Sequence, residues 1–68
     1  MTVAKVSEIK SSSPKSFEDA IKEGLARANK TLKNVKSAWV KEFEVTSGDD
    51  GQIIEYRVLM KITFILEN

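Results

Sequence analysis

The stretch from Ile53 to Leu66, which reads IIEYRVLMKITFIL, decides the fold of this chain. Every second residue in it is apolar or aromatic: Ile54, Tyr56, Val58, Met60, Ile62, Phe64 and Leu66. The residues between them are mixed and include the charged Glu55, Arg57 and Lys61. This period of two predicts a β-strand with one apolar face and one more polar face. At about 3.3 Å per residue, the strand would be roughly 46 Å long, which is longer than a small globule needs. We therefore expect another element to cover the apolar face and something outside the monomer to use the other face.

The size and composition of the chain limit how it can be stabilised. Its 68 residues suffice for a single domain, which we expect to span residues 1–68. A chain this short buries only about 60% of the surface that its unfolded form exposes. It contains no cysteine for a disulfide and no histidine, so it also lacks the usual ligands of a structural zinc. Self-association of copies is the remaining way to stabilise the fold.

The charge balance and the hydropathy pattern argue against polyanionic and membrane partners. Eleven basic and ten acidic side chains give a net charge of +1, which does not favour binding to nucleic acid or anionic lipid. No segment approaches the roughly 20 apolar residues of a membrane helix, and the N-terminal residues lack the apolar run of a signal peptide. We expect a cytoplasmic protein with neither nucleic acid nor membrane as a partner.

The rest of the chain predicts two further strands and one helix. Thr2–Lys10 and Ser37–Thr46 read as strands, and the Gly- and Asp-rich residues 46–52 read as the turn of an antiparallel hairpin. Residues 14–34 read as a helix with one apolar stripe, formed by Phe17, Ile21, Leu25, Ala28 and Leu32. The predicted fold is therefore α+β, with the order β-α-β-β and a three-stranded antiparallel sheet wrapped around one helix.

Two details of the helix are open to test. Either Ser13, followed by Pro14 at the first helical position, or Ser16, followed by Asp19 three residues later, is able to cap its N-terminus. Gly24 lies in the middle, where glycine costs about 1 kcal/mol relative to alanine. We interpret it as a point of close approach between the helix and the sheet.

The residue types exclude most enzymatic chemistry. Without histidine or cysteine, the chain lacks the common nucleophiles, general bases and transition-metal ligands. Asp49-Asp50-Gly51 lacks the spaced carboxylates of an EF-hand loop and is better explained as a turn. The basic residues late in the helix fit the helix dipole better than a nucleic-acid surface. We expect a non-enzymatic protein with no catalytic residues and no metal motif.

Trp39 is the only tryptophan, and its role has two interpretations. The local alternation places Trp39, Phe43 and Val45 on the apolar face of the second strand, which makes Trp39 a core residue. The alternative is an aromatic surface on which a planar ligand stacks. Arg57, on the polar face of the last strand, is expected to form a cross-strand ion pair with a glutamate.

Taken in order, several short segments resemble a dodecin over residues 3–67. They are Lys5-Val6, Ser16-Phe17-Glu18-Asp19-Ala20-Ile21, Ala26-Arg27-Ala28 with Lys30-Thr31-Leu32, Val40-Lys41-Glu42, Glu55-Tyr56-Arg57-Val58 and Phe64-Ile65-Leu66-Glu67. The resemblance implies a β-α-β-β subunit and a hollow homododecamer of cubic-type symmetry built from trimers. It also implies a non-enzymatic role in which flavins, riboflavin or FMN, are stored or sequestered in pairs between tryptophans at two-fold axes.

The chain departs from the family at both flavin-contacting positions. The stacking tryptophan of the family falls at Ser37, and Trp39 stands two residues later on the same side of a regular strand. The flavin-contacting glutamine falls at Arg57, as in dodecin-like proteins associated with other ligands, including calcium. The resemblance also places Ala38 and Val40 toward the helix and Trp39 toward the shell interior, opposite to the local pattern. A β-bulge between Val40 and Val45 would satisfy both.

These observations lead to two hypotheses about function. In the first, the chain forms a shell that binds and stores flavin (riboflavin or FMN), with Trp39 for stacking, Arg57 for polar recognition and Ser37 as the adjacent wall. In the alternative, it forms a structural or cation-binding assembly without flavin, in which glutamates such as Glu42 and Glu55 meet their symmetry mates and hold a cation.

The pattern of the last strand makes a first testable prediction. Phe64→Ala is expected to lower the free energy of unfolding by about 3–5 kcal/mol, because it removes a core aromatic side chain and leaves a cavity. Equilibrium denaturation measures the change. A loss below about 1 kcal/mol would mean that the strand presents its other face to the core.

Overall fold

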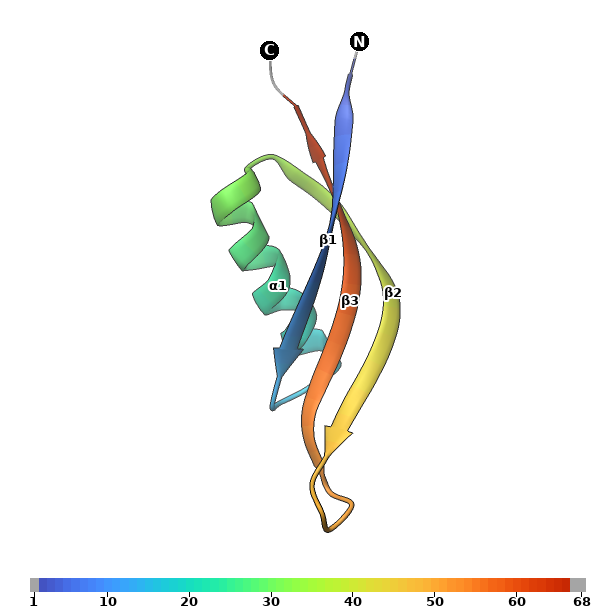
Figure 1. Ribbon diagram of the computed structural model, residues 1–68. Coiled ribbons are helices and arrows are strands. Elements are labelled where there is room, and N and C mark those ends of the chain that lie inside the picture. Colours follow the sequence, from blue (N-terminus) through green and yellow to red (C-terminus); the bar gives the residue numbers. More distant parts are fainter. Residues whose placement is uncertain (1, 67–68) are drawn as a thin grey trace.

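The computed structural model describes residues 2–66, which form three strands and one helix (Figure 1). In chain order these are β1 (Ala4–Ser13), α1 (Phe17–Leu32), β2 (Val35–Ser47) and β3 (Ile53–Ile65). The strands form one antiparallel sheet in the order β1-β3-β2, and α1 lies against one face of it. The predicted α+β fold is confirmed. The ends of the expected domain, residues 1 and 67–68, lie outside the described residues.

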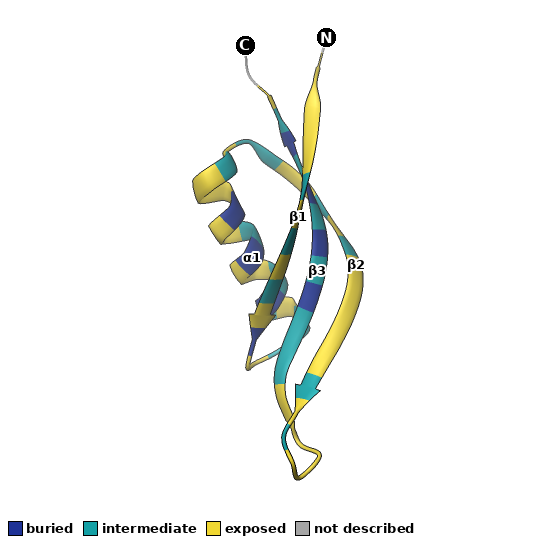
Figure 2. Cartoon of the chain, in the orientation of Figure 1, coloured by how far each residue is buried: buried dark blue, intermediate teal, exposed yellow. Residues whose placement is uncertain are grey.

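Strand β3 is the centre of the sheet and supplies most of the core. Met60 and Ile62 are completely buried, and Val58 and Phe64 are nearly so. Figure 2 shows these buried positions alternating with partly exposed ones along β3. The inner side of α1 meets them with small residues, Ala20, Gly24 and Ala28. The even-numbered face of β3 is therefore the core face, as the period of two predicts.

The connection from β1 to α1 differs from the predicted break after Lys10. β1 continues to Ser13 because its last three residues, the serines 11–13, pair with residues 56–58 of β3. The Ser13 hydroxyl donates to Asp19 Oδ2 at 2.6 Å and accepts from the Lys15 N–H at 2.9 Å, so it holds the loop rather than capping the helix. The prediction that Ser13 is the cap is wrong.

The helix begins one turn later than Pro14. Ser16 is its N-cap, and the Ser16 hydroxyl accepts a hydrogen bond from the Asp19 N–H at 3.0 Å. The helix ends at Leu32, since Lys33 and Asn34 have φ angles of 59° and 50°, in the left-handed region that a helix cannot continue through. The alternative cap at Ser16 is confirmed, and the helix is shorter than predicted at both ends.

Gly24 marks a close approach between α1 and the sheet, as predicted. A Cβ atom added to Gly24 would lie 2.7 Å from Met60 Cε and 3.0 Å from Ser11 Cβ. The Ser11 hydroxyl also donates to the Ala20 carbonyl at 2.8 Å, one helical turn before Gly24. Without a Cβ atom at Gly24, β1, β3 and α1 come together closely at this point.

A β-bulge in β2 resolves the conflict over Trp39. Val40 pairs with Met60, but Glu42 pairs with Leu59, so Lys41 is an extra residue on β2. A shift of one residue reverses which side chains face the core. Before the bulge, Ala38 and Val40 pack against the core. After the bulge, Phe43 and Val45 turn to the helix side, where the Phe43 ring meets the Phe17 ring edge-on at 5.0 Å. The bulge expected between Val40 and Val45 is present, and the interpretation of Trp39 as a core residue is wrong.

The approach at Gly24 predicts that Gly24→Ala destabilises the protein, although alanine is the better helix former by about 1 kcal/mol. The added methyl group would overlap Met60 and Ser11, and overpacking of a core costs about 1–3 kcal/mol. We expect a net loss of about 1 kcal/mol in the free energy of unfolding, measured by denaturation at one fixed protein concentration.

Ala26→Gly is the matched control, because Ala26 is an exposed residue of the same helix. It should lose about 1 kcal/mol from helix propensity alone. A Gly24→Ala protein more stable than the wild type would show that the contact between helix and sheet is loose.

Candidate functional site

The face of the sheet opposite α1, here called the open face, carries the residues singled out by the sequence. It is formed on β3 by the odd-numbered residues from Arg57 to Ile65, which alternate with the buried core positions. Residues paired directly with these lie on the same face. They include Ser37, Trp39, Glu42 and Glu44 on β2 and Glu8, Lys10 and Ser12 on β1. All three predicted site residues, Ser37, Trp39 and Arg57, therefore share one face.

Trp39 stands at the outer edge of this face with its ring largely uncovered. Its exposed fraction is 66%. It pairs across the sheet with Lys61 of β3, and the Lys61 Nζ atom lies 5.8 Å from the centre of the indole ring. This distance is within the range of a cation–π contact. The indole ring is thus mostly exposed in the subunit, and one ammonium group lies over it.

Ser37 lies two residues before Trp39 on β2 and is also exposed. Its partner on β3 is Thr63, two residues beyond Lys61. Because Ser37 and Trp39 point to the same side, the small serine leaves open space next to the indole ring. The structure brings these two predicted residues together.

Arg57 forms an ion pair within its own strand rather than across the sheet. Its Nε and Nη2 atoms donate to Glu55 Oε1 at 3.2 and 3.1 Å. Glu44 is its directly paired neighbour on β2. The expected partner type, a glutamate, is right, but the expected cross-strand geometry is wrong, because residues two apart on a strand share a face and the guanidinium reaches back along it.

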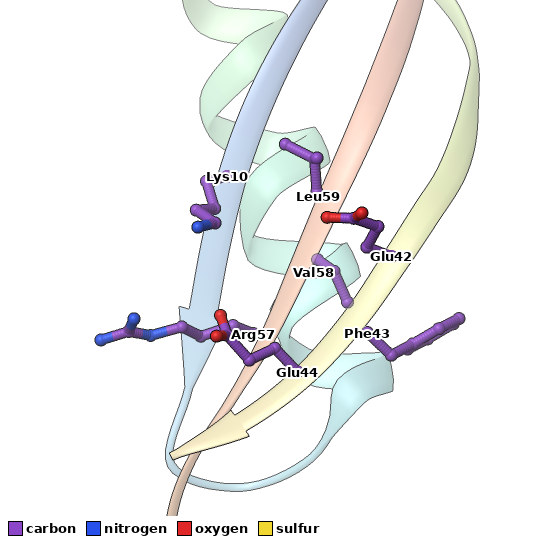
Figure 3. A pocket seen from close by; sticks show the side chains of 7 residues that line it. All are labelled: Lys10, Glu42, Phe43, Glu44, Arg57, Val58 and Leu59. Atoms are coloured by element: carbon purple, nitrogen blue, oxygen red, sulfur yellow. The ribbon is translucent and has the colours of Figure 1, made fainter.

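A shallow hollow of about 410 Å³ surrounds Arg57 (Figure 3). Its lining contains both signs of charge and comes from all three strands: Lys10, Glu42, Phe43, Glu44, Arg57, Val58 and Leu59. The figure shows the Glu44 carboxylate beside the Arg57 side chain and Lys10 on the neighbouring strand. This hollow is separate from Trp39.

The distance along β3 separates Arg57 from Trp39 within one chain. Lys61, which pairs with Trp39, lies four residues from Arg57, or about 13 Å at the usual rise per residue. The two residues therefore lie about four strand positions apart on the open face of one chain.

Two kinds of feature are absent from residues 2–66. No group of three or more Asp, Glu, His or Cys side chains is placed to hold a metal ion. No helix in this part of the chain has the length and apolar character needed to cross a membrane.

The fold agrees with a comparison to known families. A family model described as Dodecin matches residues 3–67. The chain belongs to the dodecin family. A curated dodecin from Thermus thermophilus is 40% identical to it over 65 residues, which cover 96% of this chain and 93% of the relative. The resemblance drawn from the sequence is thereby confirmed.

Solved dodecin structures match the whole subunit. The dodecin from Streptomyces davaonensis superimposes with a TM-score of 0.93 at 34% identity, covering 98% of this chain and 97% of that one. A calcium dodecin from Mycobacterium tuberculosis, described as having a novel calcium-binding site, gives a TM-score of 0.83 at 31% identity, with coverages of 96% and 91%. Membership of this family makes the chain a small non-enzymatic dodecin that assembles from copies of itself.

Lys61 is the neighbour of Trp39 that sequence analysis did not identify. Its position opposite Trp39 depends on the register of the hairpin, which the bulge at Lys41 shifts by one residue. The one feature of the sequence that could have pointed to Lys61 is its charge within an otherwise apolar run of residues.

Proposed function

We propose that this dodecin is a cytoplasmic homododecamer that binds and stores flavin, riboflavin or FMN, at sites that include Trp39. The observation that carries the proposal is the exposed indole ring on the open face, 66% uncovered in the subunit. A tryptophan side chain buries roughly 150–250 Å² when it is covered. A stacked isoalloxazine ring would supply that cover, with offset or parallel aromatic contact.

The residues around Trp39 fit such a ligand. Ser37 is small and exposed, so a ring that projects beyond the indole meets no bulky side chain on that strand. Arg57 offers a guanidinium with N–H groups in addition to those bound to Glu55, which suit a ring carbonyl or a phosphate oxygen. Arg57 lies about 13 Å along β3 from the partner of Trp39, so it would contact the end of the ligand that projects away from the indole ring, or a flavin held by another copy.

The residue types of the chain favour storage of a bound flavin over catalysis with it. The chain has no histidine or cysteine, so it offers none of the usual side chains for proton transfer or covalent attack on a bound flavin. Stacking on tryptophan without such groups holds a flavin and quenches its excited state, which suits sequestration rather than catalysis.

Trp39→Ala tests the proposal in a titration of riboflavin and FMN. We expect wild-type protein to quench both flavin and tryptophan fluorescence in a twelve-subunit species, with mass measured on the same sample. Trp39→Ala should bind flavin about tenfold or more weakly, because it loses aromatic stacking and apolar contact together.

Phe43→Leu is the control, because Phe43 is an exposed aromatic residue of the same strand on the helix side of the sheet and leucine keeps an apolar side chain there. It should leave the flavin affinity close to that of the wild type as long as the assembly has the same mass. Flavin that keeps its full fluorescence over micromolar wild-type protein would refute the flavin proposal.

A cation-binding assembly is the second candidate, favoured by the likeness to a dodecin described as binding calcium. Glu42 and Glu44 lie on the open face and line the hollow next to Arg57. Glu55 is less suitable, because its Oε1 atom already accepts both hydrogen bonds from Arg57.

Removal of divalent cations separates the two candidates. If flavin binding is the function, EDTA should leave both the assembled mass and the flavin affinity unchanged, as measured by light scattering and fluorescence. Dissociation on chelation, reversed by added calcium, would instead support a cation held between glutamates of several copies.

A further inference from the structure

We infer that Lys61 makes the Trp39 site selective for a flavin that carries a phosphate, so that FMN binds more tightly than riboflavin. The inference rests on the proposed function and goes beyond it, since it assigns a role to a residue outside the family's two flavin-contacting positions. The observation behind it is the Lys61 ammonium group 5.8 Å from the centre of the Trp39 ring.

The backbone fixes Lys61 next to Trp39. The two residues are direct partners in the pairing of β2 with β3, on the open face of the sheet. Lys61 belongs to the central strand, between the fully buried Met60 and Ile62, so its Cα position is among the most restrained in the fold. Its stem is partly buried, and its ammonium group remains beside the indole ring.

The carboxylate that faces Lys61 on β1 forms its ion pair with another lysine. Glu8 pairs with Lys61 on the β1 side, but Glu8 Oε2 lies 3.4 Å from the Lys41 Nζ atom, across β3 on the bulge of β2. Among residues 2–66, the ion pairs are those of Lys22 with Glu18, Lys41 with Glu8 and Arg57 with Glu55. Lys61 is therefore in none of the ion pairs of this part of the chain.

Arg57 is the less suitable cation for this task. Two of its nitrogen atoms are bound to Glu55, and Glu44 faces it from β2, so its charge is offset by nearby carboxylates. It also lies about 13 Å along β3 from Lys61. Within the subunit, Lys61 is the cation in contact with the stacking surface.

The chemistry of the ligand explains how Lys61 would discriminate. FMN and riboflavin share the same ring and ribityl chain, and FMN adds a phosphate that carries about −1.5 to −2 charges near neutral pH. A flavin that stacks on this face of Trp39 displaces the Lys61 ammonium group from its position over the ring. The flexible stem of lysine lets the ammonium group move to the phosphate of the stacked flavin, and lysine binds phosphate as a point charge. Riboflavin gains no such contact.

The test compares the dissociation constants of FMN and riboflavin for the assembled protein, using flavin fluorescence at low and moderate salt. For the wild type we expect FMN to bind about tenfold more tightly, the size of one charge-assisted hydrogen bond, and the preference to decrease as salt screens the charge. Lys61→Met should reduce the preference to about one, while the riboflavin affinity changes by less than about threefold, because stacking on Trp39 is kept. Lys61→Arg should retain the preference.

Lys22→Met is the control for net charge, since Lys22 is an exposed helix residue that pairs with Glu18 on the other side of the molecule. It should keep the wild-type preference. Equal binding of both flavins by the wild type, or an unchanged preference in Lys61→Met, would overturn the role of Lys61 while leaving flavin storage intact. Absence of binding for either flavin would overturn both the role of Lys61 and the proposed function.

Discussion

The packing of the even-numbered face of β3 against the small-residue side of α1 is the contact on which the subunit depends. Met60 and Ile62 are completely buried there, and Gly24 allows the helix to come close enough to exclude water. The two elements do not have the same length. Sixteen residues of helix span roughly 24 Å, whereas thirteen residues of strand span about 43 Å. The helix therefore covers the middle of β3 and leaves both ends of the sheet without cover.

The uncovered ends explain why a protein of this size assembles. Phe43, Val45 and Ile54 near the hairpin, and Val3 and Leu66 at the other end, are all about half exposed or more. A 68-residue chain without a disulfide has little stability to spare. Burying these apolar side chains against other copies stabilises the folded chain without any change to the subunit itself. Self-assembly, which the family shares, is thus a physical need of this fold as well as an inherited property.

The sequence predicted the fold and named Ser37, Trp39 and Arg57, which share the open face, but it did not give the neighbours of these side chains. The alternation from Ile54 to Leu66 identified the core face of β3. The alternation in β2 placed Trp39 on the wrong face, because Lys41 inserts one residue into the strand. A lysine in the sequence does not indicate the position of a β-bulge. The residue that Lys41 pairs with, Glu8, is 33 residues away in the chain. The sequence also did not identify which glutamate pairs with Arg57, because an ion pair along a strand and one across the sheet use the same residue types. The extension of β1 through Ser13 also depended on tertiary pairing, because three consecutive serines carry no strand preference of their own.

The order of the strands has one more consequence, which concerns the lysines. In the order β1-β3-β2 both outer strands are edges, and the outer row of backbone groups on each is open to pairing with any strand of another molecule. Lys5 and Lys10 lie on β1, and Lys36 and Lys41 on β2. Lysines at such positions hinder the continuous strand-by-strand growth that leads to fibres, while a closed assembly, by contrast, ends at a definite number of copies. Four of the eleven basic side chains of this nearly neutral chain thus lie on its two edge strands, where they hinder open-ended pairing of subunits.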